Sequence, residues 1–342
     1  MLPNRSVAAS LASKLPACYH RTVVSRNGRS NKLGCFVCGS NKIRQLFPFD
    51  DESHWVDHCR HCKTEILRPL LSPQELRKYY EGYGTTKTPY DQVEFLIDKS
   101  VAYFEGFFVV TGFDRRNTPT STFLEVGFGN GASLMAAAKL GFKAYGLDMD
   151  AECTRRVQEI ACRHGQTVHS TIGEISSLDT WLKFDVIKAS QVIEHTLDPL
   201  EFLVGLSKHQ SAGGYLLLEC PNNEATFWLV KNLLRRRFGR MNFYKSLKVS
   251  EHLYGFSKTS LARLLETVGY RIILCADYPL RDPMFHHENL LWYPTLAGGL
   301  RTFIKDRLTY PFLKSLIPPF DQLASKLAGA GTHMAVWGVK QD

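Results

Sequence analysis

The chain lacks any apolar run long enough to span a bilayer. The nearest candidate, residues 101–113, is interrupted by Glu105. Internal repeats and low-complexity stretches are also missing, and 44% hydrophobic with 22% charged residues is an ordinary globular composition. These absences argue against an integral membrane protein, a repeat protein and a disordered chain. A length of 342 residues favours one main domain with an appendage.

Acidic residues are missing from two stretches of a chain whose net charge is +9. Residues 1–49 contain none, and their first part is rich in serine and basic residues. Val7, Leu11 and Leu15 are spaced for one helical face, which is also typical of a mitochondrial transit peptide. We expect residues 1–32 to form a flexible tail of a cytoplasmic protein, or of a mitochondrial one if the tail is a transit peptide.

The second acid-free stretch, residues 225–249, combines cationic and aromatic side chains around Arg235–Arg237. It could contact anionic lipid, recognise a phosphorylated substrate, or form a solvated basic face. The aromatic residues of 278–332 lie further along the chain. Together the two stretches favour a phosphorylated or lipid-linked substrate and a peripheral membrane contact through residues 227–248.

The nine cysteines are arranged for metal binding and not for disulfides. Two Cys-x-x-Cys pairs, separated by twenty residues, can supply four thiolates to a tetrahedral zinc ion. Nearby histidines could replace one ligand, and reduced thiols beside zinc fit a cytosolic compartment. We expect a small zinc ribbon over residues 33–70 that depends on its metal for folding and has a core separate from the main domain. The four expected ligands are Cys35, Cys38, Cys59 and Cys62, and the histidines are His54, His58 and His61.

A glycine-rich turn between two apolar runs is the most informative feature of the sequence. Glycines let a backbone approach its ligand and a carboxylate takes ribose hydroxyls, so this unit predicts an adenosine-containing cofactor. The pattern also fits a dinucleotide, but Glu125 would repel a pyrophosphate bound at the turn. S-adenosylmethionine has no phosphate and is cationic, so we favour it. The turn carries Gly127, Gly129 and Gly131, and Asp148 ends the second apolar run.

Three motifs carry a family resemblance: Glu125–Gly131, Ile193–His195 and Glu251–His252. With them the chain resembles the class I S-adenosylmethionine-dependent methyltransferases, in particular a broad group that is mainly bacterial, which favours a leader over a transit peptide at residues 1–32. The resemblance covers about residues 120–278 and the last ten. It implies an α/β fold with a Rossmann-like seven-stranded sheet whose last strand is antiparallel, and S-adenosyl-L-methionine as cofactor. The implied cofactor-binding residues are Glu125, Gly127, Gly129, Gly131, Asp148 and Gln191.

Strands alternate with helices along the main domain, which predicts a parallel sheet with helices on both faces. We expect residues 71–120 to be a helical linker or lid, and 121–342 to be the methyltransferase domain with a packed helical insertion at 278–332. Within the linker, a helix starts at Ser72, and a second one, Asp91–Phe113, could close over the cofactor. The expected strands are Phe123–Val126, Lys143–Leu147, Gln166–Ser170, Phe184–Ala189, Tyr215–Glu219, Tyr270–Ala276 and His333–Val339.

Methyl transfer to a hydroxyl or a carbon acid needs a base, and His195, Glu251 and His252 are the candidates. His195 follows the fourth strand and is expected on the cofactor side, where it could instead only shape the pocket. Glu251 and His252 follow the fifth strand, on the side where an acceptor would enter. In zinc-containing sugar C-methyltransferases a related pair is acid/base machinery, but those enzymes have a tyrosine where this chain has Val249. We therefore favour His252 as a base for oxygen.

No motif identifies the acceptor. We expect a small molecule, methylated on an oxygen of a sugar, a lipid-linked compound or a secondary metabolite. The alternative is an RNA-modifying methyltransferase that holds phosphates with the zinc module and Arg235–Arg240. Ser190–Ile193 lacks the Pro-Pro-aromatic element of amino-methylating DNA enzymes, and Glu219–Pro221 lacks the cysteine elements of RNA cytosine-C5 enzymes. Nucleic acid is therefore the less favoured partner.

Overall fold

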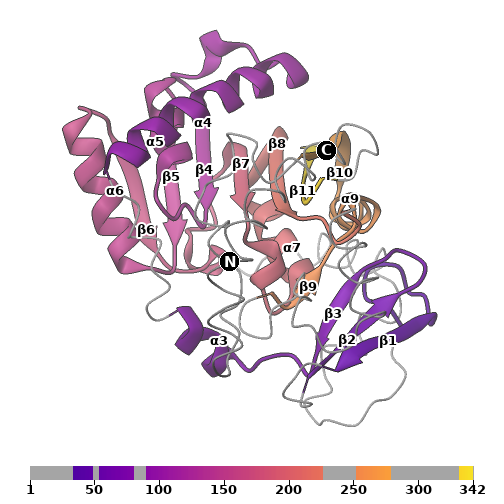
Figure 1. Cartoon of the computed structure of the whole chain (residues 1–342). Helices are drawn as coiled ribbons and strands as arrows, with labels where there is room; N and C mark the ends of the chain where they lie inside the picture. The colour runs from indigo at the N-terminus through magenta and orange to yellow at the C-terminus, as the bar shows by residue number, and fades with distance from the viewer. Residues whose placement is uncertain (1–33, 49–53, 81–89, 226–251, 279–330, 342) are drawn as a thin grey trace, which may run out of the picture.

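The computed structural model describes residues 34–48, 54–80, 90–225, 252–278 and 331–341 (Figure 1). These residues form two β-sheets, one of seven strands and one of four. Four predicted features lie wholly or almost wholly outside them: the tail at residues 1–32, Glu251, the basic segment 225–249 and the insertion 278–332. None of the helices in the described ranges has the length and hydrophobicity needed to cross a membrane.

The seven-stranded sheet has the order β10-β11-β8-β7-β4-β5-β6. Strand β11 runs antiparallel to both of its neighbours, and the other neighbouring pairs of this sheet are parallel, which confirms the predicted fold class. Strand β8 begins earlier than expected, because Gln210 pairs with Phe184 and the strand continues through Gly213 with a change of register. The strands are β4 (Thr122–Val126), β5 (Lys143–Asp148), β6 (Val168–Ile172), β7 (Phe184–Ser190), β8 (Gln210–Pro221), β10 (Tyr270–Tyr278) and β11 (His333–Lys340).

Helices cover both faces of this sheet (Figure 1). Successive residues of β7 point to opposite faces, so Val186 packs with one helical layer and Ile187 with the other. The first layer consists of α4 (Tyr90–Thr111), α5 (Ala132–Lys139) and α6 (Ala151–Arg163). The second consists of α7 (Pro199–His209) and α9 (Lys258–Thr267).

Helix α4 is built into the core and differs from the expected movable cover. Phe104 and Phe107 are fully buried, and their rings contact Phe123 of the sheet and Trp337 of β11. The preceding helix, α3 (Pro73–Tyr80), starts as predicted. The backbone amide of Ser72 donates to Glu75, and the amide of Glu75 donates to the Ser72 hydroxyl.

The four-stranded sheet contains the cysteine pairs and one strand from the methyltransferase half of the chain. Its order is β1-β2-β3-β9, and β9 (Tyr254–Gly255) pairs with β3 (Glu65–Arg68). Cys62 and Leu67 lie in the same buried cluster as Leu253 and Leu218 of the main domain. The expectation of a separate core for residues 33–70 is therefore wrong, because an apolar face this small is buried against the larger domain. The other two strands are β1 (Ile43–Pro48) and β2 (Trp55–Cys59).

Candidate active site

The glycine turn lies between the end of β4 and the start of α5. Gly127 and Gly131 have φ values of 70° and 77°, in the left-handed region that favours glycine. A Cβ atom would also lie 2.5 Å from Val192 at Gly127 and 2.5 Å from Val157 at Gly131. Glycine is thus required at both positions by conformation and by space. The turn presents backbone at the carboxyl edge of the sheet, where open α/β sheets bind ligands.

Asp148 fixes the geometry of this turn from the end of β5. Its Oδ2 accepts a hydrogen bond from the Gly129 amide at 2.9 Å, and its Oδ1 accepts one from the Asp150 amide at 2.9 Å. Burial raises the pKa of the Asp148 carboxyl, and the two amides oppose that shift. Each oxygen keeps a lone pair for a ligand hydroxyl. The predicted pairing of turn and carboxylate is present in the structure.

A buried ion network stands behind the turn. Lys188 of β7 lies with its Nζ 3.4 Å from Glu125 Oε1, 2.8 Å from Ser133 Oγ and 3.9 Å from Glu219 Oε2. Burial opposes the charge of Lys188, but Glu125 and Glu219 outweigh it and raise the pKa of the ammonium. Because Glu125 is paired with a cation, its predicted repulsion of a pyrophosphate is weaker than the sequence suggested. Lys188 and Glu219 were not among the residues predicted from the sequence.

Glu125 Oε2 and Gln191 Nε2 are among the buried polar atoms that have no hydrogen-bond partner in the described part of the chain. Gln191 follows β7 with a φ of 56°, which is uncommon for a residue other than glycine. Strained backbone of this kind concentrates at functional sites. An acceptor and a donor atom, together with the glycine turn and Asp148, fit a cofactor that carries an amino acid and a ribose.

The two candidate histidines meet at the same edge of the sheet. His195 closes the short helix Ile193–His195, and its ring centroid lies 4.8 Å from that of His252 in an edge-to-face contact. The sequence predicted His195 on the cofactor side and His252 on the acceptor side, and the structure brings the two rings into contact because the chain returns at His252 to pack on the 193–195 turn. The Leu253 amide donates to the Glu194 carbonyl at 2.8 Å and holds this return.

Glu194 lies beneath the two imidazoles and was also missed. Its side chain is 1% exposed, and neither carboxylate oxygen has a hydrogen-bond partner among the described residues. His195 Nε2 lies 3.7 Å from Glu194 Oε1. Burial raises the pKa of Glu194 to about 8. A carboxyl that is neutral near pH 7 can donate a proton or a hydrogen bond to the histidine pair.

The four predicted metal ligands converge. Cys35 Sγ lies 3.5 Å from Cys62 Sγ, and Cys38 Sγ lies 3.6 Å from Cys59 Sγ. All four sulfurs are within 4.8 Å of one another. A tetrahedral zinc ion with bonds of about 2.3 Å places its sulfurs about 3.8 Å apart, so this arrangement fits zinc. None of the predicted substitute histidines belongs to the cluster among the described residues.

Residues 106–274 match a family model described as a methyltransferase domain. The match contains the glycine turn, Asp148 and both histidines, and the sheet has the seven strands and the antiparallel last strand that the resemblance implied. The chain is an S-adenosylmethionine-dependent methyltransferase. A comparison with curated proteins gave no match.

Solved structures of other methyltransferases are similar in fold. An S-adenosylmethionine-dependent methyltransferase from Clostridium acetobutylicum is 10% identical, with 79% of this chain and 99% of that chain covered and a TM-score of 0.45. Magnesium protoporphyrin IX methyltransferase from Synechocystis, with bound S-adenosylhomocysteine, is 13% identical, with 78% and 94% covered and a TM-score of 0.46. Coclaurine N-methyltransferase is 12% identical, with 71% and 72% covered and a TM-score of 0.45. These similarities do not bear on what the present methyltransferase acts on.

Replacing the carboxylate at the end of β5 tests the cofactor site of the methyltransferase. We expect Asp148→Ala to weaken S-adenosylmethionine binding by about 1–3 kcal/mol, the usual loss for hydrogen bonds to a charged group. Asp150→Ala is the matched control, because Asp150 caps α6 through the Glu152 amide. Calorimetry on both folded variants measures the difference. If Asp148→Ala bound S-adenosylmethionine as tightly as the unmodified enzyme does, Asp148 would not be part of the cofactor site.

The buried Glu194 makes a distinct contribution to stability. Its pKa is about 8 in the folded enzyme and about 4.3 in an unfolded chain, so the unfolded state loses the proton first as pH rises. Stability should therefore fall between about pH 4.5 and pH 8, by up to about 1.4 kcal/mol per pH unit. We expect Glu194→Gln to lack this part of the pH dependence.

Urea unfolding of both proteins from pH 5 to pH 8 checks this expectation. The other titratable groups facing Glu194 are His195, His252, Cys220 and Tyr278. They are present in both proteins, so the difference between the two curves isolates Glu194. Parallel curves for the two proteins would mean that Glu194 ionises in the folded state at its ordinary pH.

Proposed function

We propose that the enzyme methylates an oxygen of a small-molecule acceptor, with His252 as the base. The observation that carries this proposal is the contact between His195 and His252 at the carboxyl edge of the sheet, 4.8 Å between ring centroids. Two imidazoles over a buried acid form a site that can accept and share a proton. Glu251, also predicted to be catalytic, precedes His252 and lies outside the described residues.

Each half of the proposed site has its own task. When bound, S-adenosylmethionine supplies an already activated methyl group. Asp148 would hold its ribose hydroxyls, and Glu125 Oε2 and Gln191 Nε2 would hold its amino-acid part. Met149 is 49% exposed beside Asp148 and offers an apolar surface to the adenine. His252 would take the proton that the acceptor oxygen loses as it gains the methyl group, and His195 would orient the His252 ring.

The proposed acceptor is a sugar, a lipid-linked compound or a secondary metabolite, with a phosphate group where the basic segment takes part. The proposed compartment is the cytoplasm, at the membrane surface if residues 227–248 contact lipid. The alternative of RNA modification gains no support from the cysteine module. In the cysteine module, strand β3 pairs with β9 and the Phe36 ring contacts Tyr254, so both are occupied by contacts within the chain.

A screen with methyl-labelled S-adenosylmethionine tests the proposal directly. Purified enzyme is offered sugars, sugar phosphates, lipid-linked sugars, hydroxylated metabolites and total RNA. We expect label in a small molecule as a methyl ether, low 260 nm absorbance in the purified protein and weak salt dependence of activity. Label transferred only to RNA would establish the alternative.

We further propose that Cys35, Cys38, Cys59 and Cys62 bind one zinc ion with a structural role. Four sulfurs complete the tetrahedral shell and leave no position for a substrate. Elemental analysis of protein purified without chelator should find about one zinc per chain. Protein that is folded, active and free of metal would rule the site out.

A further inference from the structure

We propose that the cysteine module positions His252, so that zinc occupancy controls the acceptor side of the active site and leaves the cofactor side intact. The inference rests on the proposed role of His252. It starts from the pairing of β3 with β9, in which Glu65 faces Gly255 and Ile66 faces Tyr254. His252 lies two residues before β9, so the strand of the module directs the backbone on which His252 sits.

Leu253 links the module to the histidine pair. Its carbonyl accepts a hydrogen bond from the Leu67 amide of β3 at 2.9 Å, and its amide donates to the Glu194 carbonyl at 2.8 Å. Its side chain is fully buried. His252 and His195 are the immediate neighbours of Leu253 and Glu194. One backbone unit therefore holds the His252 turn between the module and the His195 turn.

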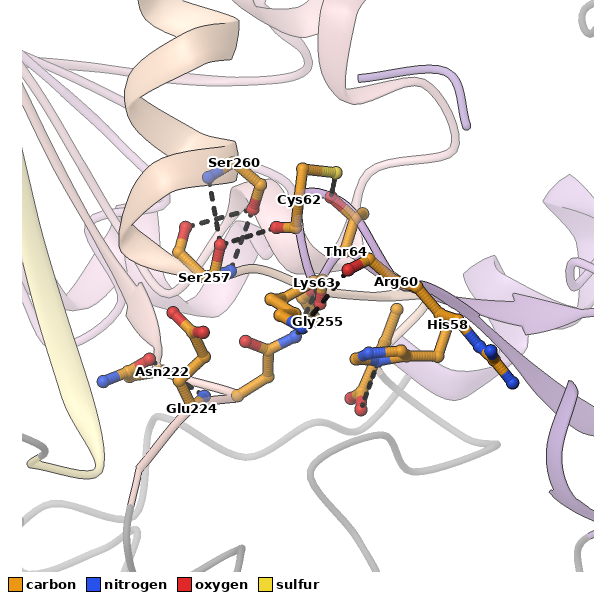
Figure 2. Close-up of polar contacts among 12 residues, drawn as sticks. His58, Arg60, Cys62, Lys63, Thr64, Asn222, Glu224, Gly255, Ser257 and Ser260 are labelled. Carbon is orange, nitrogen blue, oxygen red and sulfur yellow. Dashed lines mark hydrogen bonds and ion pairs between the residues drawn. The ribbon is translucent and has the colours of Figure 1, made fainter. Parts of the chain in front are cut away.

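A second link starts at a metal ligand. Ser257 follows β9, and its hydroxyl donates to the backbone carbonyl of Cys62 at 2.8 Å (Figure 2). The next residue of the knuckle, Lys63, has a φ of 65°, and its carbonyl accepts from Asn223. A knuckle conformation of this kind is held in place when its cysteines bind a metal. Loss of the metal would release the carbonyls to which Ser257 and Asn223 are bonded.

Packing joins the same two segments. Phe36, which follows the first ligand Cys35, contacts the Tyr254 ring edge-to-face with centroids 5.3 Å apart. The Tyr254 ring stacks on Phe256 at 6.0 Å. The Tyr254 hydroxyl donates to the Leu197 carbonyl at 3.0 Å, beyond the His195 turn. The apolar surface of the module and the strand that follows His252 therefore form one packed unit.

The cofactor side has different supports. Gly127, Gly129 and Asp148 are held by β4, β5 and each other, through bonds such as Gly129 N to Asp148 Oδ2. Within the described part of the chain, the hydrogen bonds of these three residues go to partners outside the cysteine module. A module of this size gains its folding free energy largely from its metal. Metal loss should thus disturb β9 and the two histidine turns before it disturbs the glycine turn.

Hydrogen–deuterium exchange on the full chain, with zinc and after chelation, tests the proposal without an acceptor. We expect exchange about tenfold faster or more in peptides covering 62–68, 193–196 and 252–257, with 122–148 unchanged. Affinity for S-adenosylmethionine, measured by calorimetry, should stay within about threefold. Added zinc should restore protection. These readouts hold even if the proposed base or acceptor is wrong.

Two serine variants separate the link from helix capping. Ser257 and Ser260 cap α9 reciprocally, but only Ser257 reaches Cys62 (Figure 2). We expect Ser257→Ala to speed exchange at 62–64 and 252–257, and Ser260→Ala to affect only the start of α9. Faster exchange confined to 35–68 after chelation would overturn the proposal. So would general loss of protection together with loss of cofactor binding, because zinc would then support the whole fold.

Discussion

We expect His252→Ala to lower turnover about 10²–10⁴-fold, the usual contribution of a general base, with S-adenosylmethionine affinity near normal. The reason is its place: His252 touches His195 and lies on the turn that β9 and Leu253 hold at the sheet edge. The cofactor contacts proposed for Asp148 and the glycine turn do not involve it. Single-turnover rates and calorimetry on the same variant separate the two effects.

His164→Ala is the matched control for this variant. His164 caps the end of α6 and lies 3.9 Å from Glu94, away from the sheet edge. It should keep full activity. We expect His195→Ala to lower the rate as well, and to move the pH profile of the remaining activity, because His195 contacts the base and not only the cofactor side. If His252→Ala kept full turnover on an authentic acceptor, His252 would not be the base, and Glu251 and His252 would have only a structural role.

Local requirements of the backbone made much of this site predictable from sequence. Gly127 and Gly131 need left-handed φ values and close approach, and Asp148 follows at the end of the next strand. The cysteine spacing predicted the cluster in the same way, because each pair lies within one turn. The seven-stranded sheet with its antiparallel last strand followed from the alternation of strands and helices and from the family resemblance. All these signals are carried by neighbouring residues.

Contacts between distant segments could not be predicted. Strand β9 has two residues, too few for a periodic pattern, and its pairing with β3 joins opposite halves of the chain. The continuity of the two cores follows from that pairing. The burial of Glu194 was not predicted, because only the histidine of the Ile193–His195 motif was considered as a site residue. The sequence did contain a signal for the buried ion network. Lys188 and Glu219 interrupt the apolar strands β7 and β8, and a charged residue in a central strand usually has a buried partner of opposite charge.

Removing the cation of this buried ion network is expected to have a large effect on stability. We expect Lys188→Met to destabilise the enzyme by about 3–5 kcal/mol, the cost of leaving a buried charge without its counter-ion. The ammonium lies 3.4 Å from Glu125 and 3.9 Å from Glu219, and all three side chains are at most 8% exposed. Methionine fills similar volume, so the loss reports on charge more than on packing. Urea unfolding at pH 7 measures it.

Two further variants test whether the loss of stability in Lys188→Met comes from the unpaired buried charge. Lys139→Met removes a lysine that lies 3.7 Å from Asp98 on the surface, and such exposed pairs contribute about 0–1 kcal/mol. Adding Glu125→Gln to Lys188→Met should recover part of the loss, because one uncompensated acid is then neutral. Recovery should also appear as pH falls, because burial raises the pKa of the Glu125 carboxyl and protonation removes its uncompensated charge. A loss equal to that of Lys139→Met, with no recovery in either test, would mean that the Glu125 carboxyl carries no charge for Lys188 to compensate, and the cofactor turn would then rest on hydrogen bonds alone.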